Sequence, residues 1–399
     1  MSFKVLMLGW ELPPYNSGGL GEACLGLAKA LSKKGAKITF VLPQKHDFNY
    51  DFMDLVFANV NEEGLDLVNS VYKTYETWIK DKKISISDFP SGYIAGAIKY
   101  AQKIKEIALK CKPDLIHAHD WLTFPAAIVA KSVTGVPLIT HVHSTEYDRT
   151  GGNSPNPVVV DIEKEGLMCA DRIVAISKLQ KSLLVSNYGV DESKIDIIYN
   201  GASFFGKESF SPALEVYKKM GYKIVLFLGR ITLQKGPEYF VRAARKVLDY
   251  EKKVLFVVTG DGDMFNQMLE EAVSLGVVNN FVFTGFLRGE EKDRIFQSAD
   301  IYVMPSVSEP FGITVLESIG NGTPVLVSKQ SGVSEVVQHA LKADFWDVNE
   351  IANKIISSIR YPVLLQDLIR ESKRELPGIN WDKSADKCVK IYETLLANH

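Results

Sequence analysis

Residues 3–43, FKVLMLGWELPPYNSGGLGEACLGLAKALSKKGAKITFVLP, decide the fold class of this chain. The run FKVLMLG (3–9) is continuously apolar, which is typical of a central parallel strand covered on both faces. A glycine-rich turn follows, and residues 22–34 have the amphipathic pattern of a helix that ends at Gly35. A second apolar run, KITFVLP (37–43), completes a strand–helix–strand unit. The chain therefore begins as an α/β protein with a parallel sheet.

The same alternation continues along the chain and then restarts. A helix is expected at about 92–111, followed by strands at 114–118, 137–142, 172–177 and 194–200. After a polar linker (201–211), new apolar strands are expected at 223–229, 253–260, 281–285, 301–305 and 324–328. At 399 residues the chain exceeds one ordinary hydrophobic core, so we predict two Rossmann-like halves. Residues 47–90 lack this pattern and are predicted to form an irregular lobe of the first half.

Bulk composition excludes several classes of function. The 46 Lys and Arg residues balance 48 Asp and Glu residues, so no nucleic-acid partner is expected. The four cysteines show no metal or redox spacing and are expected to be buried free thiols, which suggests a reducing, cytoplasmic location. No apolar run approaches about 18 residues, and no targeting segment is recognisable.

One lysine-rich helix suggests an alternative, in which the protein binds to a membrane surface. Its lysines are either a solvated face or a contact with anionic lipid, and the solvated face is the simpler interpretation: Lys99, Lys103, Lys105, Lys110 and Lys112. Membrane contact is therefore not expected.

The first glycine-rich turn lies where open α/β sheets bind their ligands, beyond the carboxyl end of a strand. Its Gly18-Gly19-x-Gly21 spacing either brings backbone amides to an anion or forms a tight turn. The spacing is not G-x-G-x-x-G, and no acidic residue ends the second strand to hold a ribose. A nicotinamide dehydrogenase is therefore disfavoured, and no Walker lysine is present.

Two cations of the second half occupy an unfavourable place. In GRITLQKGPEYF, Arg230 follows a strand and Lys235 precedes Gly236-Pro237, where a helix opens. A cation at a helix N-terminus opposes the macrodipole by about 0.3–1 kcal/mol. A bound anion such as a diphosphate removes that conflict. The alternative is a pair of solvated surface charges.

Two patterns raise the question of a metal. Asp261-x-Asp263 either holds a divalent cation or forms a turn with an aspartate capping the next helix, and we favour the turn. His117-x-His119 and His141-x-His143 each place two rings on one face of a strand. No third or fourth zinc ligand beyond Asp120 accompanies them, so polar groups facing a crevice are the favoured interpretation. No metal and no cofactor are expected.

Two glutamates surround a helix start in SVSEPFGITVLES (306–318). Glu309 precedes a Pro-Phe-Gly turn, and Glu317 lies inside the expected helix. Eight helical residues span about 12 Å, whereas a hydrolytic pair needs about 5–5.5 or 6.5–9.5 Å between carboxyl groups. Glu309 and Glu317 therefore fit two acceptors at opposite ends of one ligand better than an acid–base pair.

These segments together resemble a known family. SEPFGITVLESIGNGTPV resembles the E-x7-E segment of retaining glycosyltransferases of the GT-B fold, family 4, and GRITLQKGPEYF resembles their donor-phosphate Arg/Lys pair. IIYNG, with Asn200, is similar to their interdomain Asn-Gly, and residues 10–43 and HAHDW are similar to starch and glycogen synthases. The resemblance implies two Rossmann-like domains facing each other across a donor-binding cleft. In such folds the final helix returns to the first domain, which gives expected domains of 1–205 plus about 380–399, and 206–379.

The resemblance also implies roles for residues of the second domain. Glu309 contacts the donor sugar near the reacting centre, and Glu317 holds the ribose hydroxyls. Arg230 and Lys235 stabilise the diphosphate. The amides and side chains at the helix start meet the sugar and the diphosphate: Phe311, Gly312, Ile313 and Thr314. Family members contact the base through backbone, which corresponds here to Gly285 and Phe286.

In the first domain, Gly18 and Gly19 close over the diphosphate, His143 lies near the transferred sugar, and Asp120 lines the sugar or acceptor site. One departure concerns the synthases, which have Lys-Thr-Gly-Gly where this chain has Asn16-Ser17-Gly18-Gly19. The missing lysine puts glucan synthesis itself in doubt.

The implied function is retaining, metal-independent transfer of a hexose, glucose by preference, from a nucleoside-diphosphate sugar to a hydroxyl of a carbohydrate acceptor. The alternatives are a glycogen or α-glucan synthase, a nucleotide-sugar epimerase of the same fold, and a non-catalytic nucleotide-sugar sensor.

Overall fold

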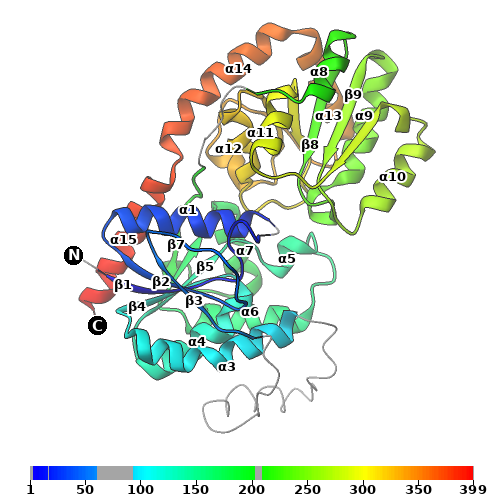
Figure 1. Cartoon of the computed structure of the whole chain (residues 1–399). Helices are drawn as coiled ribbons and strands as arrows, with labels where there is room; N and C mark the ends of the chain where they lie inside the picture. Colours follow the sequence, from blue (N-terminus) through cyan, green and yellow to red (C-terminus); the bar gives the residue numbers. More distant parts are fainter. Residues whose placement is uncertain (1–2, 17, 61–92, 203–208, 399) are drawn as a thin grey trace.

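The computed structural model describes residues 3–16, 18–60, 93–202 and 209–398, and both expected sheets are present in it (Figure 1). The strands described in the first half form one parallel sheet in the order β3-β2-β1-β4-β5-β6-β7. Val5 at its centre pairs with Ile38 on one side and Leu115 on the other. The strands are β1 (Lys4–Leu8), β2 (Lys37–Leu42), β3 (Asp54–Phe57), β4 (Leu115–His119), β5 (Leu138–Val142), β6 (Arg172–Ala175) and β7 (Ile195–Ile197).

Helices cover both faces of this sheet, as a buried parallel sheet requires. The two large apolar clusters of the first half lie on opposite faces of its strands, because alternate residues of β1 belong to different clusters. The helices are α1 (Gly19–Lys33), α3 (Tyr93–Cys111), α4 (Phe124–Thr134), α5 (Glu146–Arg149), α6 (Pro157–Cys169) and α7 (Lys178–Tyr188).

The second half repeats the plan with a parallel sheet in the order β10-β9-β8-β11-β12-β13. Its strands are β8 (Lys223–Leu228), β9 (Val254–Thr259), β10 (Phe281–Gly285), β11 (Ile301–Met304), β12 (Val325–Ser328) and β13 (Leu341–Ala343). Its helices are α8 (Pro212–Lys219), α9 (Pro237–Tyr250), α10 (Phe265–Ser274), α11 (Gly289–Ser298), α12 (Ile313–Gly320), α13 (Val348–Arg360) and α14 (Pro362–Glu375). The predicted fold class, two Rossmann-like halves, is confirmed.

The last helix, α15 (Trp381–Ala397), packs on the first half. Figure 1 shows α14 and α15 running from the second lobe down to the first, where both chain ends lie. Cys388 and Tyr392 of α15 are fully buried in the same cluster as Leu27 and Leu31 of α1. A β-carbon at Gly26 would lie 2.4 Å from the Trp381 ring, so only glycine allows this close packing. The division at 1–205 plus 380–399, and 206–379, is retained as a proposal, and its boundary near 205 lies outside the described residues.

Some sequence expectations were wrong in detail. Residues 54–57 form strand β3 inside the segment predicted to be irregular, and the rest of that segment from residue 61 lies outside the described residues. Strand β13 was missed because LKA is short and its pattern is mixed. Cys24 and Cys388 are buried as expected, but Cys169 is exposed and Cys111 only half-buried.

Among the side-chain contacts between the two halves, two have a carboxylate as the acceptor. The Glu335 carboxylate of the second half accepts hydrogen bonds from the first two amides of α7, both at 2.9 Å, and from the Tyr199 hydroxyl at 3.0 Å. Near the opposite rim, the Ser308 hydroxyl donates to the Asp148 carboxylate of α5 at 2.8 Å. These bonds fix the segment just before Glu309 against the first half.

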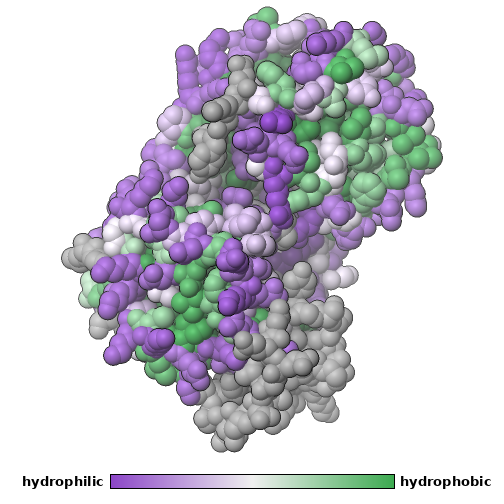
Figure 2. All heavy atoms as spheres, in the orientation of Figure 1, coloured by the Kyte–Doolittle hydropathy of each residue, from purple (hydrophilic) through white to green (hydrophobic). Residues whose placement is uncertain are grey.

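The surface drawn in Figure 2 is hydrophilic over much of both lobes, with smaller hydrophobic areas between. In the described part of the chain, no helix is long and apolar enough to cross a membrane.

Candidate active site

The carboxyl edge of the second sheet brings the predicted cation Lys235 to the predicted glutamate Glu309. Lys235 ends a short 3-10 turn after β8, and its ammonium forms an ion pair with the Glu309 carboxylate. The sequence predicted either a bound anion beside this cation at the start of α9 or a solvated surface charge. In this structure that anion is a side chain, because Glu309 neutralises Lys235.

Glu309 is held by its backbone as well as by its charge. Its amide donates to the Gln330 carbonyl at 3.0 Å, and its carbonyl accepts from the Gly332 amide at 2.8 Å. Only 6% of the residue is exposed. A nearly buried carboxylate with a single lysine partner is expensive to leave unpaired, so its orientation is strongly determined.

Glu317 has a lysine partner of its own. Its carboxylate lies 2.7 Å from the ammonium of Lys292, which comes from α11. Burial lowers the pKa of Lys292, but the nearby charges of Glu317 and Glu22 and the bond to Glu317 outweigh it, so that pKa is raised. Lys292 therefore stays charged beside Glu317.

A cavity of about 230 Å³ opens beside this pair between the two halves. Helix α1 of the first half lines one wall, and α11 and α12 line the other. Glu22, Lys292 and Glu317 all reach it. The predicted ribose-binding glutamate therefore faces the space between the domains.

The start of α12 lies between the two glutamates. Gly312 is its N-cap in a left-handed conformation (φ 106°), and the Thr314 hydroxyl lies 3.0 Å from the Tyr302 hydroxyl. The expectation that the Phe311 side chain meets a ligand was wrong, because it is 98% buried and packs near Tyr199. Only the backbone of Phe311 is left for that role.

Gly18 of the first half lies against Arg230 of the second. A β-carbon at Gly18 would lie 3.1 Å from the Arg230 guanidinium nitrogen Nη2, closer than ordinary contact. Gly19 is the first residue of α1 and is exposed. The structure thus brings the glycine turn and the predicted phosphate-binding arginine together across the cleft.

Asp120 occupies a strained position directly after β4. Its backbone angles (φ 60°, ψ 168°) belong to a region that residues other than glycine rarely adopt, at a cost of about 1–3 kcal/mol. This conformation aims Oδ1 at the amides of His143 (2.6 Å) and Ser144 (3.2 Å). Burial raises the pKa of Asp120 to about 7, although those two amides and Arg149 act in the opposite direction.

The four histidines of β4 and β5 form one stack of rings. His117 Nε2 lies 3.2 Å from His141 Nδ1, and His119 Nδ1 lies 2.9 Å from His143 Nε2. Burial lowers the pKa of every member, to about 3 for His117 and His143, so the stack is neutral near pH 7. Of the four histidines, His143 fits the predicted position facing a crevice best, because it is 8% exposed and the other three are at most 1% exposed.

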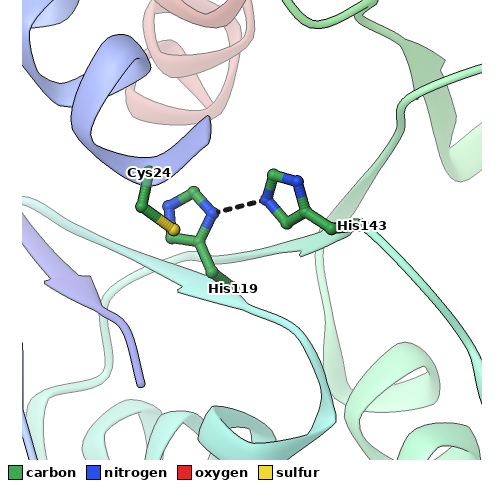
Figure 3. Close-up of side chains that lie close together, drawn as sticks. All are labelled: Cys24, His119 and His143. Carbon is green, nitrogen blue, oxygen red and sulfur yellow. Dashed lines mark hydrogen bonds between the residues drawn. The ribbon is translucent and has the colours of Figure 1, made fainter. Parts of the chain in front are cut away.

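Cys24 joins this stack, which the sequence analysis did not foresee. Figure 3 shows its sulfur beside His119, with His143 beyond, and the ligand atoms of all three lie within 4.8 Å of one another. The expectation of no third ligand beyond Asp120 was therefore wrong, because α1 brings Cys24 in from a distant part of the sequence. His117, His119 and His141 form a second group of this kind.

The thiol of Cys24 and two of the ring nitrogens beside it are in states that a bound ion would have to change. Burial, aided by the charges of Asp120 and Glu11, raises the pKa of the Cys24 thiol well above its usual value, which disfavours the thiolate that a metal needs. His119 Nδ1 and His143 Nε2 are already bonded to each other. Three further ring nitrogens of the stack, His119 Nε2, His141 Nε2 and His143 Nδ1, are buried without a hydrogen-bond partner in the described part of the chain. A metal-free site remains a proposal.

The remaining predicted residues lie at the margins of the cleft. Asn200 is buried at the junction next to Gly201, whose neighbours are Asn380 and Trp381 of the last helix. Gly285 (φ 74°) and Phe286 end β10 and are exposed. Asp263 does not cap the next helix as expected, because α10 has Met264 as its N-cap.

Sequence reasoning missed Lys292 as well as Cys24. Lys292 occurs in the charged run GEEKDR, which reads as an ordinary solvated helix face. Its significance appears only when α11 is placed beside α12. No local signal distinguishes it from its neighbours.

Known protein families match both halves of the chain. The family model described as glycosyl transferases group 1 matches residues 214–375, and the model described as glycosyltransferase family 4 matches residues 17–203. An uncharacterised glycosyltransferase of Methanocaldococcus jannaschii is 30% identical over 98% of both chains. A glycogen synthase of Mycobacterium tuberculosis is 24% identical over 98% of this chain and 94% of its own.

Among solved structures, a sucrose-phosphate synthase from Thermosynechococcus elongatus superimposes with a TM-score of 0.76 at 18% identity, covering all of both chains. That likeness concerns the fold, which is GT-B.

Proposed function

We propose, from the premise that this chain belongs to the glycosyltransferases, that it is a retaining, metal-independent hexosyltransferase. The donor in this proposal is a nucleoside-diphosphate hexose, glucose by preference, and the acceptor is a carbohydrate hydroxyl. One observation supports it above the others. Lys235 and Glu309 form an ion pair just before the start of α12, and in this proposal the donor's leaving group and sugar bind there.

The proposed reaction exchanges one bond for another on the same face of the sugar. The bond from the anomeric carbon to the diphosphate oxygen breaks, and a bond from that carbon to the acceptor oxygen forms. The acceptor proton passes to the departing phosphate oxygen. Arg230 and Lys235 stabilise the charge that develops there, which is the kind of contribution that accounts for most of the rate in such sites.

Donor binding changes the partners of both lysines in this proposal. The diphosphate competes with Glu309 for Lys235, and the ribose hydroxyls compete with Lys292 for Glu317. The carboxylate of Glu309 is then available to the sugar hydroxyls. The ion pairs seen here keep buried charges neutralised until the donor replaces them.

The first domain contributes neutral hydrogen-bonding groups in this proposal. His143 Nδ1 is buried without a hydrogen-bond partner in the described part of the chain. A sugar hydroxyl would provide that partner, and the low pKa of His143, caused by burial, keeps the ring neutral. Asp120 fixes the segment carrying His143 through its amide and lies at the acceptor side.

A melting-temperature screen with ADP, UDP, GDP and their glucose conjugates tests the donor assignment. A ligand at about 100-fold its Kd adds about 2.7 kcal/mol to the free energy of unfolding, a clear upward shift in Tm. The same screen with Lys235→Ala is the matched control and should lose most of that shift. If no nucleotide raises the Tm of the natural chain, the donor site is wrongly assigned.

Glycogen or α-glucan synthesis is the second candidate, because the mycobacterial glycogen synthase matches nearly the whole chain. The absence of the synthases' lysine at Asn16 counts against it. An epimerase of this fold or a non-catalytic sensor would not release free nucleoside diphosphate in an acceptor-dependent manner, so that release separates both from a transferase. A cytoplasmic location stays a prediction.

A further inference from the structure

Arg288 lies outside every motif discussed above, yet it makes a two-point contact between the domains. It precedes the first residue of α11, in the second half. Its Nη1 donates to the Pro14 carbonyl and its Nη2 to the Asn16 carbonyl, both at 2.8 Å. Both carbonyls belong to the segment of the first half that leads into the glycine turn.

The Asn16 side chain carries this contact onward to the turn. Its Nδ2 donates to the Gly18 carbonyl at 2.9 Å. A β-carbon at Gly21 would lie 2.6 Å from the Asn16 β-carbon, so Asn16 also packs closely on the first turn of α1. Moving Asn16 therefore moves Gly18.

Gly18 in turn lies against Arg230, as described above. The contacts thus run from Arg288 in the second half, through Asn16 and Gly18 in the first half, back to Arg230 in the second. Arg288 itself is positioned by the Phe286 ring, which lies 4.9 Å from its guanidinium carbon. Phe286 is one of the two residues that the base would contact in the proposed site.

We propose that Arg288 is a positioning residue for transfer: by binding the Pro14 and Asn16 carbonyls it holds the Gly18 turn over the diphosphate at Arg230. This rests on the proposed function, because the diphosphate at Arg230 is part of it. The geometry of the guanidinium matters here. Its planar fork reaches two carbonyls at once, whereas a lysine ammonium on a flexible chain binds as a single point.

Kinetics of Arg288→Ala and Arg288→Lys test the proposal, with Arg245→Ala as a matched control on the exposed face of α9. Arg288→Ala is expected to raise the donor KM about threefold to tenfold, since two exposed charge-assisted hydrogen bonds are lost together. It should also raise the fraction of donor lost to water, because the turn no longer covers the diphosphate. Arg288→Lys should recover only part of either effect. The Tm should stay near that of the natural chain.

Hydrogen exchange without any ligand provides a readout independent of catalysis. Arg288→Ala should speed exchange in peptides spanning residues 10–21, and Arg245→Ala should not. Unchanged exchange there, or an unchanged donor KM together with unchanged donor hydrolysis, overturns the role of Arg288. If Arg288→Ala speeds exchange but the natural chain transfers no sugar, the proposed function is wrong. The contact of Arg288 between the domains then stands without a role in transfer.

Discussion

The carboxyl edges of the two sheets face the same cleft but carry opposite kinds of polar group. The first sheet ends in a neutral histidine stack and a carboxyl group whose pKa is raised by burial to about 7. The second ends in ion pairs, Lys235 with Glu309 and Lys292 with Glu317. Neutral groups suit sugar hydroxyls, and paired charges suit a diphosphate and a ribose. In the proposed function, the two domains would therefore recognise different parts of one donor.

The largest expected effect comes from the charged edge. Lys235→Ala should lower kcat/KM about 10²–10³-fold. In other enzymes, loss of one group that stabilises the charge developing in the transition state has an effect of this size. His143→Gln, at the neutral edge, should cost only about tenfold, the value of one hydrogen bond between neutral groups. Steady-state kinetics with the donor found in the melting screen measure both.

Lys246→Ala, on the exposed face of α9, is the control for Lys235 and should behave as the natural chain. Equal losses from Lys235→Ala and His143→Gln would contradict the division of roles between the domains.

The next effect separates the two glutamates. Glu317→Ala should weaken nucleotide binding about tenfold with a smaller change in kcat, because the ribose loses one charged acceptor. Glu309→Ala should mainly lower kcat, because its carboxylate acts at the transferred sugar. Calorimetric titration with the nucleoside diphosphate, beside turnover measurements, distinguishes these effects. The reverse pattern would exchange the roles of the two residues.

The last effect is on stability rather than on activity, and it concerns the neutral edge. The folded pKa values of His117 and His143, about 3, lie below the ordinary 6.5, so the unfolded chain binds more protons between these pH values. Stability is therefore present above pH about 6.5 and is lost as the pH falls toward 3. Each such histidine contributes a slope of about 1.4 kcal/mol per pH unit.

Chemical denaturation between pH 7.5 and 5 measures this slope. His141→Gln, within the stack, should reduce this slope by about the contribution of one histidine, since burial lowers the pKa of His141 too. His46→Gln lies outside the stack and is the control. Asp120 acts with the opposite sign, because its raised pKa makes stability decrease as the pH rises from about 4 to 7. If the free energy of unfolding of the natural chain does not fall more steeply below pH 6.5, the stack is protonated in the folded state.

Much of the fold followed from the sequence because apolar runs alternate with amphipathic ones. FKVLMLG became β1, and each further expected strand was found within one or two residues of its expected ends, apart from β7, which ends three residues early. Strands β3 and β13 were missed because both lie at sheet edges, where half-buried residues give a mixed pattern.

The site was predictable in part for the same reason. Arg230, Lys235 and Glu309 follow strands or precede helices, so their local positions mark them, and Glu317 is marked by its spacing from Glu309. Cys24 and Lys292 lie on ordinary helix faces, and only packing between distant segments gives them their neighbours. The sequence also could not show that the two predicted ligand-binding glutamates would each be neutralised by a lysine.

The return of α15 to the first domain has a consequence for how the chain is made. Cys388 and Tyr392 complete the core formed by α1 and β1, although almost the whole chain separates these segments. Residues 381–397 must therefore leave the ribosome before the first domain can close its core, while the core of the second domain needs the chain only as far as Ile379. The domain synthesised first is the one that finishes folding last.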